Sequence, residues 1–308
     1  MTTAWLPYAD QAEAEERLGG VPDGIEVVPF AGDGSWPDGL AEVEFFVVPY
    51  LKGPEVLARV EEMTSLRYIQ TLTAGVENFL PHVPDGVQLH NAAGVHDAST
   101  AELAVALALA SGRHLDVAAR DMPTGTWGTD FGRSIADQRV LIIGYGNIGA
   151  AIERRLAGFE TASITRVARR ARTGETPVHP ITELPDLLPA ADVVFVIAPH
   201  TPETEGLIGA PELALLPHGA LLVNVARGKL VDTEALTAAT ADGRIRAALD
   251  VTEPEPLPPD HPLWRTPGVL ITPHVGGAST AFFPRADRLI AAQLTRLAAG
   301  EPLENQIK

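Results

Sequence analysis

The sequence predicts an α/β protein with two Rossmann/flavodoxin-like parallel-sheet domains and a cleft between them. Short apolar segments alternate with helical or turn-rich segments on both sides of a glycine-rich motif at residues 144–149, a pattern typical of parallel sheets covered by helices. The motif lies near the middle of the chain, so a whole α/β unit precedes it. At 308 residues, the chain is long enough for two domains that each bury a sizeable core.

The N-terminal third of the chain is expected to form the sheet of the first domain. Apolar segments predict strands at residues 25–28, 43–48, 66–72 and 87–89. Residues 55–60 have helical spacing, and a long helix is predicted over residues 99–119. Ser99 or Thr100 is the expected N-cap of that long helix, and turn-forming residues follow it.

The alternation continues around and after the glycine-rich motif. Residues 140–143 are predicted to form a buried strand, and an amphipathic helix follows the glycines. Further strands are predicted at residues 163–167, 193–197, 220–225, 246–249 and 269–272. Four prolines within residues 254–259 predict an extended loop, and residues 280–299 predict a final helix.

These elements predict a discontinuous domain. The last helix is too short to be a domain, so we expect it to pack back on the first unit. The first domain is therefore expected to comprise residues 1–97 and 281–308, and the second domain residues 98–280. We expect the two domains to close over bound ligand.

Composition excludes several classes of function. A net charge of −17 argues against a nucleic-acid or anionic-membrane partner. The absence of cysteine excludes disulfides and thiolate metal sites, and we expect no metal centre. No apolar run approaches the roughly 18 residues of a membrane span. The N-terminal residues lack the basic and apolar regions of a secretory signal, so we expect a cytoplasmic protein.

Gly144, Gly146 and Gly149 fit the pattern G-x-G-x-x-G between a predicted strand and a predicted helix. The first glycine permits a tight turn, the second lets backbone approach a pyrophosphate, and the third lets the helix pack on the strand. The phosphates would lie at the helix N-terminus, beside Asn147 and Ile148. This context predicts a dinucleotide site. Residues 98–280 are therefore the expected dinucleotide-binding domain, and residues 1–97 and 281–308 the expected substrate (catalytic) domain.

The residues that select between NAD and NADP lie about 20 positions beyond the glycines, at the end of the next strand. An acidic residue there would bind the ribose 2′-hydroxyl and repel a 2′-phosphate. This chain has Ala168, followed by Arg169 and Arg170. Guanidinium groups match the geometry and charge of a phosphate, so we expect NADP to be preferred over NAD.

Three predicted strands are each followed by a side chain capable of catalysis. Arg227 follows residues 220–225, Glu255 follows 246–249, and His274 follows 269–272. In an open α/β sheet, ligands bind beyond the carboxyl ends of the strands. These three side chains are therefore expected to converge on the reacting end of the dinucleotide.

At these positions the chain resembles the D-isomer-specific 2-hydroxyacid dehydrogenases. The resemblance covers nearly the whole chain and rests on GYGNIG (144–149), APHTPET (198–204), VNVARGKLVD (223–232), ALDVTEPEPLP (248–258) and TPHVGG (272–277). It implies that Arg227, Glu255 and His274 are the catalytic trio, and that the loop at Thr73, Ala74 and Gly75 binds the substrate carboxylate. It also implies a homodimer, which the long apolar helix near Ser99 would suit.

The implied roles agree with the chemistry of reducing a 2-oxo acid. His274 would protonate the carbonyl oxygen, since an imidazole pKa of roughly 6.5 suits proton exchange near neutrality. Glu255 would fix its tautomer, and Arg227 would hold the carboxylate and polarise the ketone. Further cofactor contacts are implied at Ala198, Pro199, His200, Thr204, Val225, Ala226, Asp250, Gly276 and Gly277.

The leading hypothesis is an NADP-dependent reductase of small anionic 2-oxo acids such as glyoxylate or hydroxypyruvate. Two alternatives stay open: a dehydrogenase of a small anion such as phosphite on the same scaffold, and a nucleotide-sensing binding protein similar to the family's corepressors. Glutamate at 255, where the formate dehydrogenase branch has glutamine, argues against formate. Substrate choice would depend on side chains near Tyr50, Leu51, Trp264, Phe282 and Phe283.

Overall fold

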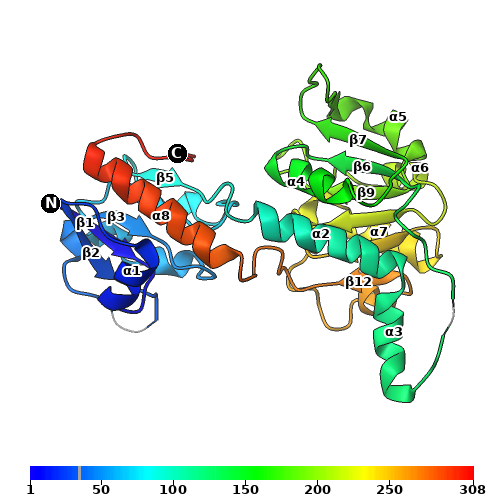
Figure 1. Cartoon of the computed structure of the whole chain (residues 1–308), viewed down its shortest axis with the longest axis horizontal. Coiled ribbons are helices and arrows are strands. Elements are labelled where there is room, and N and C mark those ends of the chain that lie inside the picture. Colours follow the sequence, from blue (N-terminus) through cyan, green and yellow to red (C-terminus); the bar gives the residue numbers. More distant parts are fainter. Residues whose placement is uncertain (34–35, 129) are drawn as a thin grey trace. The chain divides into compact units, whose positions relative to one another are not determined.

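A computed structural model describes residues 1–33, 36–128 and 130–308, which form two compact units. Unit one contains Met1–His96 and Thr280–Lys308, and unit two contains Asp97–Ser279. The chain therefore passes between the units twice (Figure 1). Both crossings lie one residue earlier than the boundaries that the sequence predicts.

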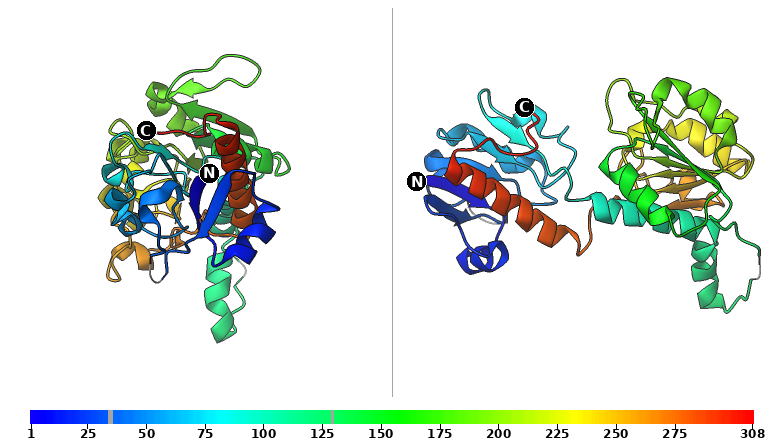
Figure 2. Two further views of the ribbon diagram at one scale, coloured as in Figure 1. Left: turned by 90° about the vertical axis from the view of Figure 1, so that its left-hand side faces the viewer. Right: turned by 45° about the horizontal axis from the view of Figure 1, so that its top comes forward.

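Unit one is a five-stranded parallel sheet in the order β2-β1-β3-β4-β5, the order of flavodoxin-like folds. Helices α1 and α8 pack together on one face, where Ala14 and Leu294 join a core with strand residues such as Phe45 (Figures 1 and 2). Short 3-10 turns cover the other face. The elements are β1 (Thr2–Leu6), α1 (Gln11–Leu18), β2 (Ile25–Pro29), β3 (Val43–Val47), β4 (Tyr68–Gln70), β5 (Gln88–His90) and α8 (Phe282–Ala299).

Unit two is a seven-stranded parallel sheet in the order β12-β11-β10-β9-β6-β7-β8. The strand order reverses between β6 and β9, which is the switch point where doubly wound sheets bind nucleotides. The strands are β6 (Arg139–Ile143), β7 (Ser163–Ala168), β8 (His179–Pro180), β9 (Val193–Val196), β10 (Leu221–Asn224), β11 (Arg246–Leu249) and β12 (Val269–Ile271). The helices are α2 (Asp97–Gly112), α3 (Leu115–Asp121), α4 (Asn147–Leu156), α5 (Leu184–Leu187), α6 (Ala210–Leu215) and α7 (Thr233–Ala241).

The strands of unit two are apolar on both faces because helices cover both faces. Along β6, Leu141 and Ile143 belong to one core, whereas Val140 and Ile142 belong to the core on the opposite face. Helices α2 and α4 pack on the second of these faces. Each fully buried aliphatic side chain contributes about 1.5–3 kcal/mol by leaving water. The carboxyl ends of the strands are thereby held at a rigid edge.

Two helix predictions are wrong. Residues 55–60 form parts of two 3-10 turns, Pro54–Leu57 and Val60–Glu62. The helix predicted over 99–119 is broken after Gly112, whose carbonyl accepts a hydrogen bond from Arg133 N at 2.7 Å. His114 then adopts a φ of +54° before α3 begins. Because α2 begins at Asp97, neither Ser99 nor Thr100 is its N-cap.

Two elements of unit one, β1 and α1, have no counterpart in the sequence prediction. All strands that the sequence predicts are confirmed, with ends that lie within a few residues of the predicted bounds. The final helix, predicted over 280–299, begins at Phe282. No helix in the described ranges is both long and apolar enough to cross a membrane.

Candidate active site

The glycine-rich loop lies between β6 and α4, at the switch point of the sheet. Gly144 has a φ of +104°, and a Cβ there would lie 2.4 Å from Ala198 N. A Cβ on Gly149 would lie 2.6 Å from Gly144 O. At Gly146 a Cβ would meet nothing within 4 Å, so the backbone is open where α4 begins at Asn147. This shape fits a pyrophosphate against a helix N-terminus.

The loop after β9 lies beside the glycine-rich loop and is held by its own hydrogen bonds. Ala198 is buried against Gly144. Thr204 Oγ1 donates to Pro199 O at 2.8 Å and accepts from Thr201 N at 2.8 Å. His200, next to Pro199, lies 3.4 Å from a Glu205 oxygen through its Nε2. The loop therefore has a fixed shape at the nucleotide edge of the sheet.

The arginines after β7 are exposed at the same edge. Arg169 and Arg170 follow the last residue of the strand, Ala168. Arg172 donates to Tyr145 O and lies over the Tyr145 ring, 5.4 Å from its centroid, which ties it to the glycine-rich loop. Hydrogen bonding to Thr201, with a smaller contribution from the charge of Arg169, lowers the pKa of Glu203. A carboxylate therefore lies within electrostatic reach of Arg169.

Arg227 follows β10 in a turn that the buried side chain of Asn224 holds. Asn224 Nδ2 donates to Arg227 O at 3.0 Å, and its Oδ1 accepts from Ala226 N at 3.1 Å. The Arg227 guanidinium donates to Ala226 O at 2.7 Å. The next residue is Gly228, where a Cβ would lie 1.9 Å from Thr252 O. Only glycine lets this loop pack against the loop that carries Glu255.

His274 and Glu255 form a hydrogen-bonded pair, with Nδ1 and Oε1 2.5 Å apart. Their side chains are 47% and 39% exposed, so both reach solvent. The hydrogen bond to Glu255 is the largest influence on the pKa of His274 and raises it, while burial and the Arg227 charge oppose this rise. The opposing effect of Arg227 places its charge near the imidazole. The three side chains thus meet at one end of the sheet.

Asp250 stabilises the loop that carries His274 through hydrogen bonds. It is 2% exposed and accepts hydrogen bonds from Thr272 Oγ1 at 2.6 Å, Val275 N at 2.9 Å and Gly276 N at 2.8 Å. Its own carbonyl accepts from His274 N at 2.8 Å. His274 has a φ of +53°, a conformation that costs energy for a residue with a Cβ. The four hydrogen bonds to Asp250 stabilise that conformation.

The other residues that the sequence predicts for the site are distributed over both units. Val225 is buried and Ala226 half-buried at the end of β10, and Gly277 follows Gly276 in the His274 loop. Thr73, Ala74 and Gly75 follow β4 in unit one, where Thr73 Oγ1 donates to Gly75 O at 2.7 Å. Tyr50 stacks on Phe282 with ring centroids 3.9 Å apart, also in unit one. Leu51, Phe283 and Trp264 are exposed.

Sequence reasoning missed two residues that shape the site. Asn224 is a polar residue at the end of an apolar strand, and Gly228 directly follows the candidate arginine. A buried asparagine at a strand end is a signal that the following turn needs hydrogen bonds. The close approach of Gly228 to Thr252 depends on another loop and has no local signal.

The arrangement is suited to proton transfer beside an anion. It brings together a cation, an imidazole with a raised pKa, and a carboxylate that holds the other ring nitrogen. Within the part of the chain that the structure describes, no group of three or more His, Asp or Glu residues is placed to hold a metal ion. The glycine-rich loop follows β6 at the carboxyl edge of the same sheet.

Comparison with known proteins identifies relatives of this chain. Residues 105–276, more than half of the chain, match the family model described as D-isomer specific 2-hydroxyacid dehydrogenase, NAD binding domain. A glyoxylate reductase/hydroxypyruvate reductase of Mus musculus is 34% identical over 254 residues, which cover 79% of this chain and 77% of that protein.

Solved structures resemble the whole chain. One is a D-isomer specific 2-hydroxyacid dehydrogenase from Xanthobacter autotrophicus Py2 in complex with NADPH and MES, with 31% identity and a TM-score of 0.80. The match covers 100% of this chain and 98% of that one. Another is an NADPH-dependent glyoxylate/hydroxypyruvate reductase from Sinorhizobium meliloti in complex with citrate, with 27% identity, a TM-score of 0.81 and coverage of 100% and 98%.

Proposed function

The chain belongs to the D-isomer specific 2-hydroxyacid dehydrogenase family, and from this premise we propose that it is an NADPH-dependent reductase of small 2-oxo acids such as glyoxylate and hydroxypyruvate. The observation that carries the proposal is the hydrogen-bonded pair of His274 and Glu255 beside Arg227. The names of the relatives support the same substrate class.

Three residues of unit two have separate roles in the proposed reduction of a 2-oxo acid. A bound nicotinamide cofactor would supply a hydride for C2 of the 2-oxo acid. His274 Nε2 gives a proton to the carbonyl oxygen, because Nδ1 is held by Glu255. Glu255 favours the imidazolium form by raising the pKa of His274. Arg227 binds the substrate carboxylate and stabilises negative charge that develops on the carbonyl oxygen.

The cofactor proposal rests on the glycine-rich loop and the arginines. Gly144, Gly146 and Gly149 hold the pyrophosphate at the start of α4. Arg169 and Arg170 bind the 2′-phosphate of NADPH, and Ala168 leaves space that an acidic side chain would fill with repelling charge. NADPH is therefore preferred over NADH. In unit one, the loop at Thr73, Ala74 and Gly75 is the proposed carboxylate-binding loop.

We also propose a cytoplasmic homodimer. Helix α3 and the loop after it extend away from the sheet of unit two (Figure 1). This segment exposes five large apolar side chains: Leu115, Val117, Met122, Trp127 and Phe131. Large exposed apolar side chains that lie close together along the chain are a common feature of protein–protein interfaces. Light scattering that gives a mass near the 32.6 kDa of one chain would contradict the dimer.

A panel of substrates tests the proposed function. The loss of NADPH absorbance at 340 nm is followed with glyoxylate, hydroxypyruvate and longer 2-oxo acids, and the formation of NADPH is followed with phosphite and NADP. The proposal predicts turnover of at least one small 2-oxo acid. Turnover of phosphite alone would identify the small-anion dehydrogenase, and cofactor binding without any turnover would favour a nucleotide-sensing protein.

A further inference from the structure

We propose that Asn91 is a positioning residue that aims the backbone N–H groups of residues 74–76 at the substrate carboxylate. We further propose that the C-terminal tail, residues 301–308, holds the same loop through the buried amides of Gln293 and Gln70. This inference deepens the proposed function and rests on it. It concerns unit one, where all of these residues lie.

The carbonyl groups of the loop are all engaged within the protein. Thr73 O accepts a hydrogen bond from Ala92 N at 2.9 Å. Ala74 O accepts from Asn91 Nδ2 at 2.7 Å, and Gly75 O accepts from Thr73 Oγ1 at 2.7 Å. Asn91 is itself oriented, because its Oδ1 accepts from the backbone N–H two residues later at 3.1 Å. Three successive peptide groups are therefore fixed by their carbonyl ends.

A fixed carbonyl determines where the next N–H points. In a trans peptide, the C=O of one residue and the N–H of the next point in opposite directions. The N–H groups of Ala74, Gly75 and Val76 therefore point away from the partners of the three carbonyls. In the described part of unit one, none of these three N–H groups donates a hydrogen bond within the chain. Successive backbone N–H groups without a partner in the chain are suited to binding an anion.

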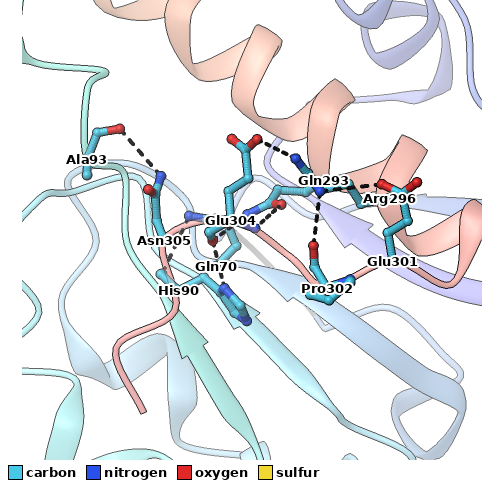
Figure 3. A network of polar contacts seen from close by, with 9 residues as sticks. All are labelled: Gln70, His90, Ala93, Gln293, Arg296, Glu301, Pro302, Glu304 and Asn305. Atoms are coloured by element: carbon cyan, nitrogen blue, oxygen red, sulfur yellow. Dashed lines mark hydrogen bonds and ion pairs between the residues drawn. The ribbon is translucent and has the colours of Figure 1, made fainter.

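Two buried amides connect the segments that hold this loop to helix α8 and the tail, and Figure 3 shows Gln70, Gln293 and Glu304 of this network. Gln70 is fully buried, and its Nε2 donates to Thr71 O at 2.8 Å and to Asn91 O at 3.0 Å. Its Oε1 accepts from Gln293 Nε2 at 2.7 Å. Thr71 Oγ1 donates to Thr73 O at 3.1 Å. Gln70 thus links helix α8 to both segments that hold the loop.

The network continues into the tail. Gln293 Nε2 also donates to Glu304 O at 3.0 Å, and Gln293 Oε1 accepts from Glu304 N at 3.0 Å. His90 Nδ1 lies 2.8 Å from the same Glu304 carbonyl oxygen. The tail runs antiparallel beside β5, with Asn91 N donating to Asn305 O at 3.1 Å and Ile307 N donating to Leu89 O at 2.7 Å. The tail therefore anchors Asn91 directly as well as through Gln70.

Asn91→Asp tests the positioning role with minimal change in shape. The variant keeps the oxygen that accepts from Ala93 N but replaces the donor to Ala74 O with an acceptor. We expect KM for glyoxylate to rise roughly tenfold, which is the effect of about 1.4 kcal/mol. kcat is expected to change less than about threefold, and NADPH affinity is expected to stay unchanged because the nucleotide loop lies in unit two. Asn78→Ala, an exposed asparagine near the same loop, is the matched control.

Gln293→Leu tests the link to the tail, with circular dichroism and chemical denaturation as the checks that unit one is folded. We expect a severalfold higher KM with little change in kcat. Oxalate binding, measured by calorimetry in the presence of NADPH, provides a readout without turnover and is expected to weaken in parallel. Unchanged oxalate affinity in Asn91→Asp, or no oxalate binding to the wild type, would overturn the inference. These two outcomes can be told apart from a failure of the proposed function, in which the wild-type protein would turn over no 2-oxo acid.

Discussion

The Nδ1 atom of His274 lies 2.5 Å from Oε1 of Glu255, so Nε2 is the imidazole nitrogen that remains to exchange a proton with a substrate. This relationship joins a loop after β11 to a loop after β12, neighbouring strands of one sheet. Because the hydrogen bond to Glu255 raises the pKa of His274, the imidazolium form persists to higher pH than in an ordinary histidine. In the proposed function, protonated His274 gives its proton to a carbonyl oxygen near neutral pH.

Glu255→Gln is expected to narrow the pH range of reduction. Reduction needs protonated His274, so its rate falls as pH rises through the pKa of that residue. The amide cannot raise this pKa as the carboxylate does, and the alkaline limb of kcat/KM moves to lower pH. The loss of activity is therefore largest at about pH 8 and small near pH 6. A profile identical to that of the wild type would exclude this role for Glu255, and NADPH affinity serves as the control.

Asp250→Asn is expected to loosen the His274 loop. The carboxylate accepts from Thr272, Val275 and Gly276, and an amide offers one oxygen and one donor in its place. At least one buried N–H then faces another donor, which costs about 1–3 kcal/mol of folding free energy. We expect this loss in chemical denaturation together with a lower kcat. Wild-type stability and kcat in this variant would show that Asp250 does not hold the loop.

The double variant Arg169→Ala and Arg170→Ala is expected to weaken NADPH binding roughly tenfold or more, the effect of losing a charge-assisted hydrogen bond. NADH binding is expected to change little, because it has no 2′-phosphate. Adding Ala168→Asp is expected to shift the preference toward NADH. Fluorescence titration with both cofactors measures these affinities. Equal loss of NADPH and NADH binding would place the two arginines elsewhere in the site.

Acid is expected to destabilise unit one through His90. Burial lowers the pKa of this residue, whose Nδ1 pairs with Glu304 O. Below about pH 6.5 the unfolded chain binds a proton that the folded chain does not, so stability falls as pH decreases. His90→Asn retains a donor without titrating and is expected to reduce the loss. Denaturation curves at pH 7.5 and 5.5 compare the two proteins, and an equal loss in both would assign the acid sensitivity to other groups.

Local pattern predicts much of this fold because strand periodicity and glycine spacing are local properties. Strands β6, β9 and β10 are confirmed for this reason, and the parallel two-domain α/β class follows from their alternation with helices. The break after Gly112 was missed because it depends on a hydrogen bond from Arg133, which lies beyond the helix in sequence.

The candidate site was less accessible to sequence reasoning. Residue types and strand ends indicated Arg227, Glu255 and His274, but the positive φ of His274 has no signal in its own sequence. The hydrogen bond between Gln70 and Gln293 joins residues 223 positions apart. Such a pair is visible only when the fold brings the last helix beside β4.

The kcat of His274→Ala in the NADPH-dependent reduction of glyoxylate or hydroxypyruvate tests directly whether His274 is the proton donor. Loss of a general acid lowers the rate by about 10²-fold or more, and we expect such a loss with NADPH affinity unchanged. Wild-type turnover by His274→Ala would contradict the assignment of His274 as the proton donor and the mechanism built on it.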